Sequence, residues 1–138
     1  HCMMTINALC LETLPDLVQR IMQKRKEYGG NRFCVMSFNI LRFPSFQSAL
    51  VLPDSIKLKH VEKLKQLRNA GLDFHEFELG QLDRLIEYLQ VVDKPHSEGF
   101  DMPRLHNDFK QFYTQYDIRR NKNFATTFPE LEEWYESI

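Results

Sequence analysis

The sequence has few cysteines, and their arrangement excludes the sites that cysteine clusters usually build. Its 138 residues include three cysteines, Cys2, Cys10 and Cys34, and no C-x-x-C pair. An odd, scattered set is typical of a reducing compartment, so we predict a cytoplasmic protein with buried free thiols. A metal site or iron–sulfur cluster held by this chain alone is not expected.

The sequence also lacks a strong charge bias, a long apolar run and the common catalytic motifs. The net charge of −1 argues against a nucleic-acid partner. No apolar run approaches a membrane span, and no signal peptide is visible. No phosphate-binding glycine loop, H-x-x-x-H pair or nucleophile elbow occurs. We therefore predict neither a membrane partner nor a metal role for the five histidines, which are His1, His60, His75, His96 and His106.

Charged runs are present, and we interpret them as solvated helix faces. They are the basic run Arg20 to Lys26 and the acidic pairs Glu76/Glu78 and Glu132/Glu133. We also place His60 on a charged helical face. Because the first residue is His1 and an apolar run follows at once, we expect a chain that starts inside a longer protein, as an excised domain or a truncated reading frame.

The first part of the chain reads as strand, helix, strand. The apolar stretch of residues 1–9 and the aromatic and β-branched stretch 32–41 are typical of strands. Between them, Thr13 can cap a helix, Pro15 suits its first turn, and Gly29-Gly30 ends it. A helix of this length between two strands predicts a βαβ unit with parallel strands.

The rest of the chain predicts helices. After a short extended piece at "QSALVLP", we expect a helix through Asn69 that Asp54 or Ser55 caps. Helices over 76–92 and 104–120, a loop at "KPHSEGFDMP", and a last helix that a Thr127–Glu130 capping box opens should follow. The aromatic stripe of the 104–120 helix should be core. It consists of Phe109, Phe112, Tyr113 and Tyr116.

Two parts with different roles follow from this pattern. Residues 1–53 form a βαβ unit, and residues 54–138 form a helical carboxyl-terminal extension. A parallel sheet needs both faces covered, which two strands and one crossover helix cannot provide. The fold class is therefore α/β, with the βαβ part as the end of a larger parallel sheet or partial (β/α) barrel.

Polar side chains follow the predicted strands toward their carboxyl ends, where parallel α/β folds bind ligands. Thr5 and Asn7 lie there on the first strand, and Ser37 and Asn39 on the second. Each pair shares one face because side chains alternate along a strand. Arg42 follows, and its guanidinium suits a carboxylate or phosphate. Two alternatives stay open: the polar side chains bond nearby loop backbone, and Arg42 forms a salt bridge to a helix.

Three stretches of the chain are informative together: "TINALCLETLPDLVQRI", "SFNILRFPSFQSALVLPDSIK" and "YTQYDIRRNKNFATTFPELEEWY". They resemble a late barrel strand with its helix, the last strand, and the terminal pattern of radical S-adenosylmethionine proteins with a twitch-type extension, and so the carboxyl-terminal part of those proteins. The tail is the most specific of them. Its matching residues are Asp117, Arg119, Asn123, Phe124, Phe128, Pro129, Glu130 and Leu131.

The resemblance implies an enzyme that binds a [4Fe–4S] cluster and S-adenosylmethionine and abstracts hydrogen from a small-molecule or peptide substrate. Asn7, Ser37 and Asn39 would contact the cofactor, and Arg42 a substrate anion. The C-x-x-x-C-x-x-C motif that holds the cluster is absent from this chain. Alone it should bind no cofactor and be inert, and the amino-terminal remainder of the barrel would be its partner. The alternative is a non-catalytic α/β interaction module whose apolar sheet face docks on another protein.

Overall fold

The chain is an α/β protein with two parallel strands and a majority of helical residues. The computed structural model describes residues 1–30, 33–91 and 100–138. The elements of the first part are β1 (Cys2–Ile6), α1 (Leu14–Tyr28) and β2 (Met36–Ile40). Then come α2 (Asp54–Arg68), α3 (Glu76–Leu89), α4 (Met102–Arg120), α5 (Phe124–Thr127) and α6 (Glu132–Ser137). His96 and most of the predicted "KPHSEGFDMP" loop lie outside the described residues.

The predicted βαβ unit is confirmed. β1 and β2 pair in parallel, with Cys2 opposite Met36 and Ile6 opposite Ile40. The connecting helix α1 has Pro15 in its first turn, as predicted, although Thr13 makes no side-chain capping bond. It ends at Gly29, whose φ of 133° favours a residue without a Cβ. The predicted ends of the helix were therefore close to the observed ones.

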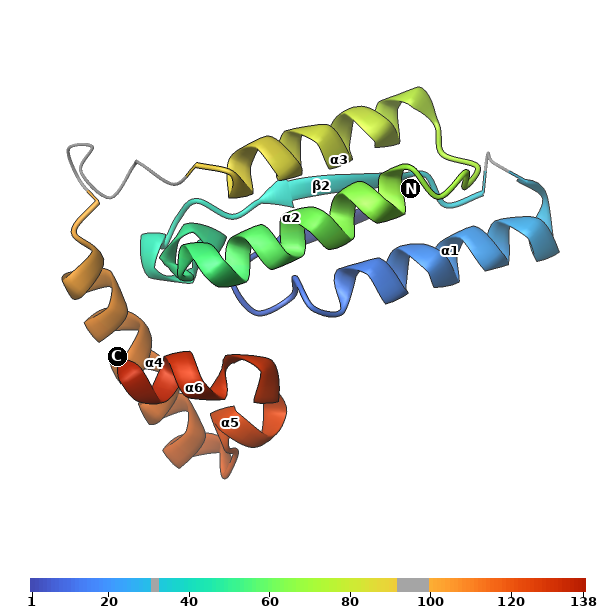
Figure 1. The fold of residues 1–138 in the computed structure, drawn as a ribbon. Coiled ribbons are helices and arrows are strands. Elements are labelled where there is room, and N and C mark those ends of the chain that lie inside the picture. Colours follow the sequence, from blue (N-terminus) through green and yellow to red (C-terminus); the bar gives the residue numbers. More distant parts are fainter. Residues whose placement is uncertain (31–32, 92–99) are drawn as a thin grey trace.

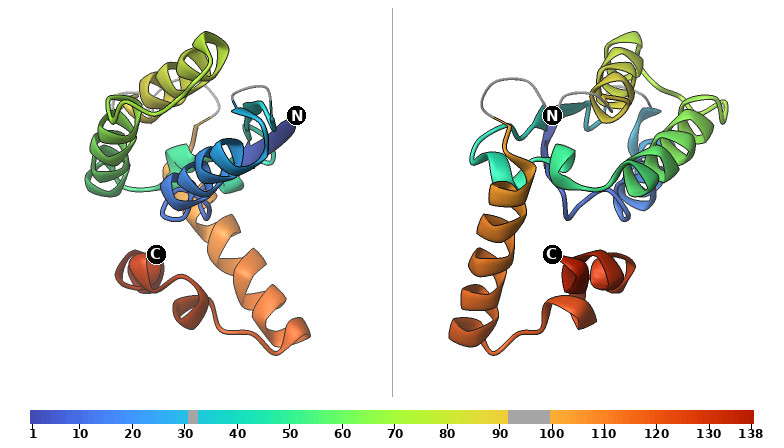
Figure 2. Two further views of the ribbon diagram at one scale, coloured as in Figure 1. Left: turned by 90° about the vertical axis from the view of Figure 1, so that its right-hand side faces the viewer. Right: turned by 60° about the vertical axis from the view of Figure 1, so that its left-hand side comes forward.

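One face of this small sheet is apolar and covered. Met4 and Ile6 of β1 and Met36 and Phe38 of β2 are buried in the core with residues of α1, α2 and α3. Figure 1 shows β2 between α1 and α3, and the right-hand view of Figure 2 shows all three helices on one side of the strands. The helices thus form a single layer over a single face of the sheet.

Three local predictions were wrong. The stretch "QSALVLP" is not extended, because it lies largely in the 3₁₀ helices η2 (Ser45–Gln47) and η3 (Ala49–Val51). The Ser48 hydroxyl starts η3 by accepting a hydrogen bond from the Leu50 amide at 3.2 Å. Neither Asp54 nor Ser55 caps α2, since the helix begins at Asp54 and Pro53 holds the capping position.

The third wrong prediction concerns the carboxyl-terminal segment, which folds back on α4 in short helices (Figure 1). Thr127 ends α5 instead of opening a helix, and its hydroxyl donates to the Asn123 carbonyl at 2.9 Å. Asn123 is the true cap, since its side chain accepts from the Thr126 amide at 2.8 Å. Phe109 of α4 anchors the segment through ring contacts with Phe124, Trp134 and Tyr135.

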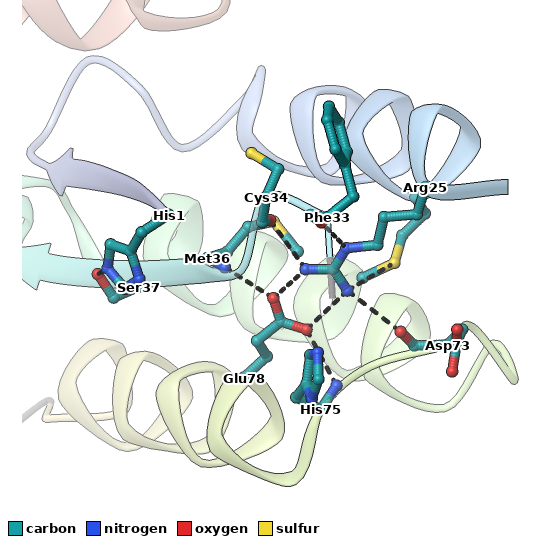
Figure 3. A network of polar contacts seen from close by, with 10 residues as sticks. His1, Arg25, Phe33, Cys34, Met36, Ser37, Asp73, His75 and Glu78 are labelled. Atoms are coloured by element: carbon teal, nitrogen blue, oxygen red, sulfur yellow. Dashed lines mark hydrogen bonds and ion pairs between the residues drawn. The ribbon is translucent and has the colours of Figure 1, made fainter. Parts of the chain in front are cut away.

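A buried ion pair joins α1 to α3, and it contradicts two of the solvated-face predictions. The side chains of Arg25 and Glu78 are 1% and 2% exposed, and their guanidinium and carboxylate meet in two hydrogen bonds (Figure 3). The same carboxylate accepts from the amides of Met36 at 2.7 Å and His75 at 3.0 Å. The helical periodicity of the sequence did not reveal this pair, because it does not show whether a charged side chain contacts an opposite charge or water.

The pair depends on the charge of Glu78. Burial alone would raise the pKa of Glu78, but the hydrogen bonds from Arg25, Met36 and His75 outweigh burial and lower it. A lowered pKa in the folded chain stabilises the fold above the pKa of the unfolded state. That contribution is lost as the pH falls through the folded pKa.

His60 is likewise buried instead of lying on a solvated face. Its Nδ1 lies 3.9 Å from Oε2 of Glu12, and the other oxygen of that carboxylate, Oε1, accepts from Lys63 at 2.6 Å. Burial lowers the pKa of His60. The face of α2 that carries His60 is therefore part of the core.

Removing the Glu78 carboxylate should lower the free energy of unfolding more than removing a neighbouring carboxylate. We predict that Glu78→Ala lowers the free energy of unfolding by about 3–5 kcal/mol, because Arg25 is left buried without its counter-charge. The matched control is Glu76→Ala in the same turn of α3, which is exposed and should cost within about 0.5 kcal/mol. Urea unfolding followed by circular dichroism measures both. Equal losses for the two variants would show that the pair contributes little.

Candidate functional site

The second face of the sheet carries three polar side chains beside Met3, and no helix of the described residues lies over this polar face. The register places Thr5 beside Asn39 and Met3 beside Ser37, all on the face opposite the buried methionines. Thr5 and Asn39 are exposed, and Met3 is 70% exposed. Neighbouring strands lie about 4.8 Å apart, so Thr5 and Asn39 can contact one ligand. The structure thus brings together three of the polar side chains that the sequence singled out.

Ser37 lies toward the amino-terminal side of this polar face. Its hydroxyl is hydrogen-bonded to Nε2 of His1 at 2.9 Å. Figure 3 shows these two side chains together beside β2. This hydrogen bond partly satisfies Ser37, whereas the side chain of Asn39 has no hydrogen-bond partner among the residues described. Asn39 therefore has the greater capacity to bind a ligand.

Asn7 lies just beyond the carboxyl end of β1, in a tight turn. The side-chain Oδ1 of Asn7 accepts a hydrogen bond from the Leu9 backbone amide at 2.9 Å. The backbone amide of Asn7 donates to Cys10 Sγ at 3.2 Å. The side-chain oxygen of Asn7 is therefore bonded by loop backbone, which was one of the two alternatives that the sequence left open. Its NH₂ group has no partner in the described part of the chain, so Asn7 can offer donors to a ligand.

Arg42 follows β2 and is exposed. Arg42 does not form the salt bridge to a helix that was the alternative prediction, since it pairs with no acid among the residues described. Its guanidinium lies over the ring of Tyr88 in α3, 5.8 Å from the centroid. An exposed cation–π contact of this kind is worth about 0.5–1 kcal/mol and leaves the donors of Arg42 accessible.

The two edges of the sheet differ. The outer edge of β2 is closed by side chains of α3: Glu78 accepts from the Met36 amide, Gln81 accepts from the Phe38 amide at 3.0 Å, and Arg84 donates to the Phe38 carbonyl. In a parallel pair, alternate residues of each strand direct their amide and carbonyl groups away from the partner. These helix side chains occupy the positions where a next strand would bond.

The outer edge of β1 is open. Cys2 donates to Val35 and Ile6 accepts from Leu41, so Met3 and Thr5 direct their backbone groups away from β2. In the described part of the molecule the Met3 and Thr5 amides have no acceptor, and the Thr5 carbonyl has only the Cys10 thiol at 3.8 Å. An unpaired strand edge of this kind can accept another strand.

Aromatic side chains on α4 add a feature that the sequence interpretation missed. Phe109 and Tyr113 are buried as predicted, but Phe112 and Tyr116 are 43% and 46% exposed. Both line two hollows, with volumes of ≈ 530 and ≈ 410 Å³, on either side of α4. The signal was the width of the stripe, because four aromatic residues cover more of the helix than α5 and α6 can bury.

The cysteines do not form a metal site. All three are free and half-buried, less buried than predicted. Burial raises the pKa values of Cys2 and Cys10, which disfavours the thiolates that bind metals. No group of three His, Cys, Asp or Glu side chains in residues 1–30, 33–91 and 100–138 could hold a metal ion. These residues do not fit a [4Fe–4S] cluster.

Comparison with known proteins gives no evidence on function, so a function has to be inferred from the geometry described above. No protein-family model, no curated protein and no solved structure matches the chain. Within the described residues, no helix has the length and apolar character needed to cross a membrane.

The difference between the two edges can be measured by hydrogen exchange. We predict that the amides of Met3 and Thr5 exchange fast, while those of Met36 and Phe38 are protected by Glu78 and Gln81. The variant Gln81→Ala should accelerate exchange at Phe38 and leave Met4, which bonds β2, unchanged. Strong protection of Met3 and Thr5 in the monomer would contradict an open β1 edge.

Proposed function

We propose that this chain is the carboxyl-terminal end of a radical S-adenosylmethionine enzyme, in which β1 and β2 are the last strands of a partial (β/α) barrel. The observation that carries the proposal is the one-sided sheet. Helices cover its apolar face and the β2 edge, while its polar face and the β1 edge are open. The last strands of a barrel need this asymmetry, because their inner face lines the ligand site and their leading edge pairs with the preceding strand.

In this proposal the polar face becomes part of the wall of the barrel. Asn39 and Ser37 would contact S-adenosylmethionine from the sheet, and Asn7 would offer its NH₂ group at the rim. Arg42, with its donors free, would hold an anionic group of a small-molecule or peptide substrate. The helices α4, α5 and α6 would cover the carboxyl ends of the strands as the twitch-type extension.

The chain on its own would not carry out radical chemistry. Since its cysteines fit no cluster, the cluster would have to be held by the amino-terminal remainder of the barrel. The boundary at residue 53 between barrel and extension also stays a prediction. It was placed by the order of the elements along the chain, whereas α2 and α3, which come after residue 53, pack on the sheet.

An alternative function is a non-catalytic interaction module, and the open β1 edge favours it too. The expected apolar docking face is not available, because that face is buried beneath α1, α2 and α3. A partner would instead add a strand to β1 through main-chain hydrogen bonds. The two functions differ in where the added strand comes from.

The coding sequence upstream of His1 separates these functions. We expect about 200 further residues, roughly the missing strands and helices of a barrel, with a C-x-x-x-C-x-x-C motif after an early strand. Sequencing the transcript from its 5′ end is the measurement. An initiator methionine at or near His1, or an upstream region without the motif, would rule out the radical enzyme and leave the interaction module.

Arg42 offers a test of the site itself in the full-length enzyme. We predict that Arg42→Ala reduces substrate turnover and changes the free energy of unfolding by only about 0.5 kcal/mol, because the side chain is exposed. Arg104→Ala, which removes an exposed arginine from the start of α4, is the matched control and should leave both quantities unchanged. A large loss of stability in Arg42→Ala would instead assign Arg42 a structural role through Tyr88.

A further inference from the structure

A pocket with a volume of ≈ 410 Å³ lies between the loop after β1 and the carboxyl-terminal helices. It is separate from the polar sheet face, although the loop that forms one wall begins only a few residues after Thr5. Its principal lining residues are Leu9, Phe112, Tyr116, Lys122, Phe124 and Phe128. The volume is in the range of sites that bind small molecules.

The walls of the pocket are mostly aromatic. Phe124 forms the buried part, and its ring lies 5.1 Å from that of Phe128. Phe112 and Tyr116 contribute exposed ring surface from α4. Burying such surface against a ligand gains about 25 cal/mol per Å² of apolar area, and flat rings gain most from another flat ring. The walls therefore favour a planar aromatic molecule.

The lining of the pocket includes one cation, Lys122, and one anion, Asp117. Asp117 lines it, but one of its carboxylate oxygens already accepts a hydrogen bond from the Phe124 amide at 2.8 Å. Lys122 lines it as well, and within the described residues its ammonium has no ion pair. The lining thus offers Lys122 as a cation without an ion pair, while the Asp117 carboxylate is held by its hydrogen bond from the Phe124 amide.

We propose that this pocket binds a planar aromatic carboxylate. The rings lie against Phe112, Tyr116 and Phe128, and the carboxylate meets the ammonium of Lys122. Phe124 forms the end of the pocket, and Leu9 closes the side nearest the sheet. Such a site needs no iron–sulfur cluster and no barrel, so it holds whether or not the chain belongs to a radical enzyme.

The competing location is the hollow on the other side of α4. That hollow, with a volume of ≈ 530 Å³, shares Phe112 and Tyr116 but has Arg119 and Arg120 in place of Lys122. Both arginines lie in the last turn of α4, where cations stabilise the helix carbonyl ends without any ligand. It also lacks Phe124 and Phe128, so fewer rings can enclose a planar molecule.

The test is a titration of the full chain, followed by two-dimensional NMR, with 2-naphthoate and with its neutral analogue 2-naphthamide. In low salt, Lys122→Gln should weaken 2-naphthoate binding about fivefold, the upper range for an exposed ion pair, and leave 2-naphthamide unchanged. Tyr116→Ala should weaken both probes about tenfold, since both lose a ring contact. Shifted amide signals should lie at Phe124 and Phe128.

Arg119→Gln is the matched control, because it removes the cation of the other hollow. It should leave the affinity for both probes unchanged. The proposal is overturned if neither probe binds saturably, if Arg119→Gln and not Lys122→Gln weakens 2-naphthoate, or if Lys122→Gln weakens both probes equally. None of these outcomes bears on the upstream sequence, so this proposal and the radical enzyme can fail independently.

Discussion

The arrangement of α1, β2 and α3 depends on one buried ion pair, Arg25 with Glu78. The guanidinium of Arg25 donates to the carbonyls of Phe33, Cys34 and Asp73 as well as to Glu78. The Glu78 carboxylate in turn accepts from the first amide of β2, that of Met36. Helix α1, the start of β2 and helix α3 therefore meet at one point. Such a pair tolerates burial because the donors of the guanidinium and both carboxylate oxygens have partners.

The ion pair also determines at which edge of the sheet the backbone groups have hydrogen-bond partners. Glu78, Gln81 and Arg84 lie three residues apart on α3, so they follow one face of the helix along β2. Because the pair fixes the start of α3 beside β2, the next two side chains fall opposite the Phe38 backbone. Among the helices that the structure describes, none lies along the outer edge of β1, and α1 crosses over the apolar face instead. The open edge is thus a consequence of where the ion pair holds α3.

The sequence predicted well what depends on apolar periodicity and helix stops. The βαβ unit, the helices α2, α3 and α4, and the end of α1 at Gly29 all follow from such patterns. It failed where a partner far away in the chain decides the outcome. Arg25 and Glu78 are 53 residues apart, and each alone looks like a solvated charge. Phe112 and Tyr116 look like core residues, because a helix alone does not reveal how much of its surface its neighbours will cover. Thr5, Ser37 and Asn39 were placed on one face because strand alternation is a local property.

The polar face and the aromatic pocket both lie where the chain leaves the sheet, for one geometric reason. Helix α4 docks on the segment that follows β2, through Phe46 against Phe112 and a hydrogen bond of 2.8 Å between His106 and the Val51 carbonyl. This docking holds α4 beside the carboxyl ends of the strands. The helices α5 and α6 then fold back onto the side of α4 that carries Phe109. Because they cannot also reach Phe112 and Tyr116, ring surface stays accessible beside Leu9, close to the end of β1.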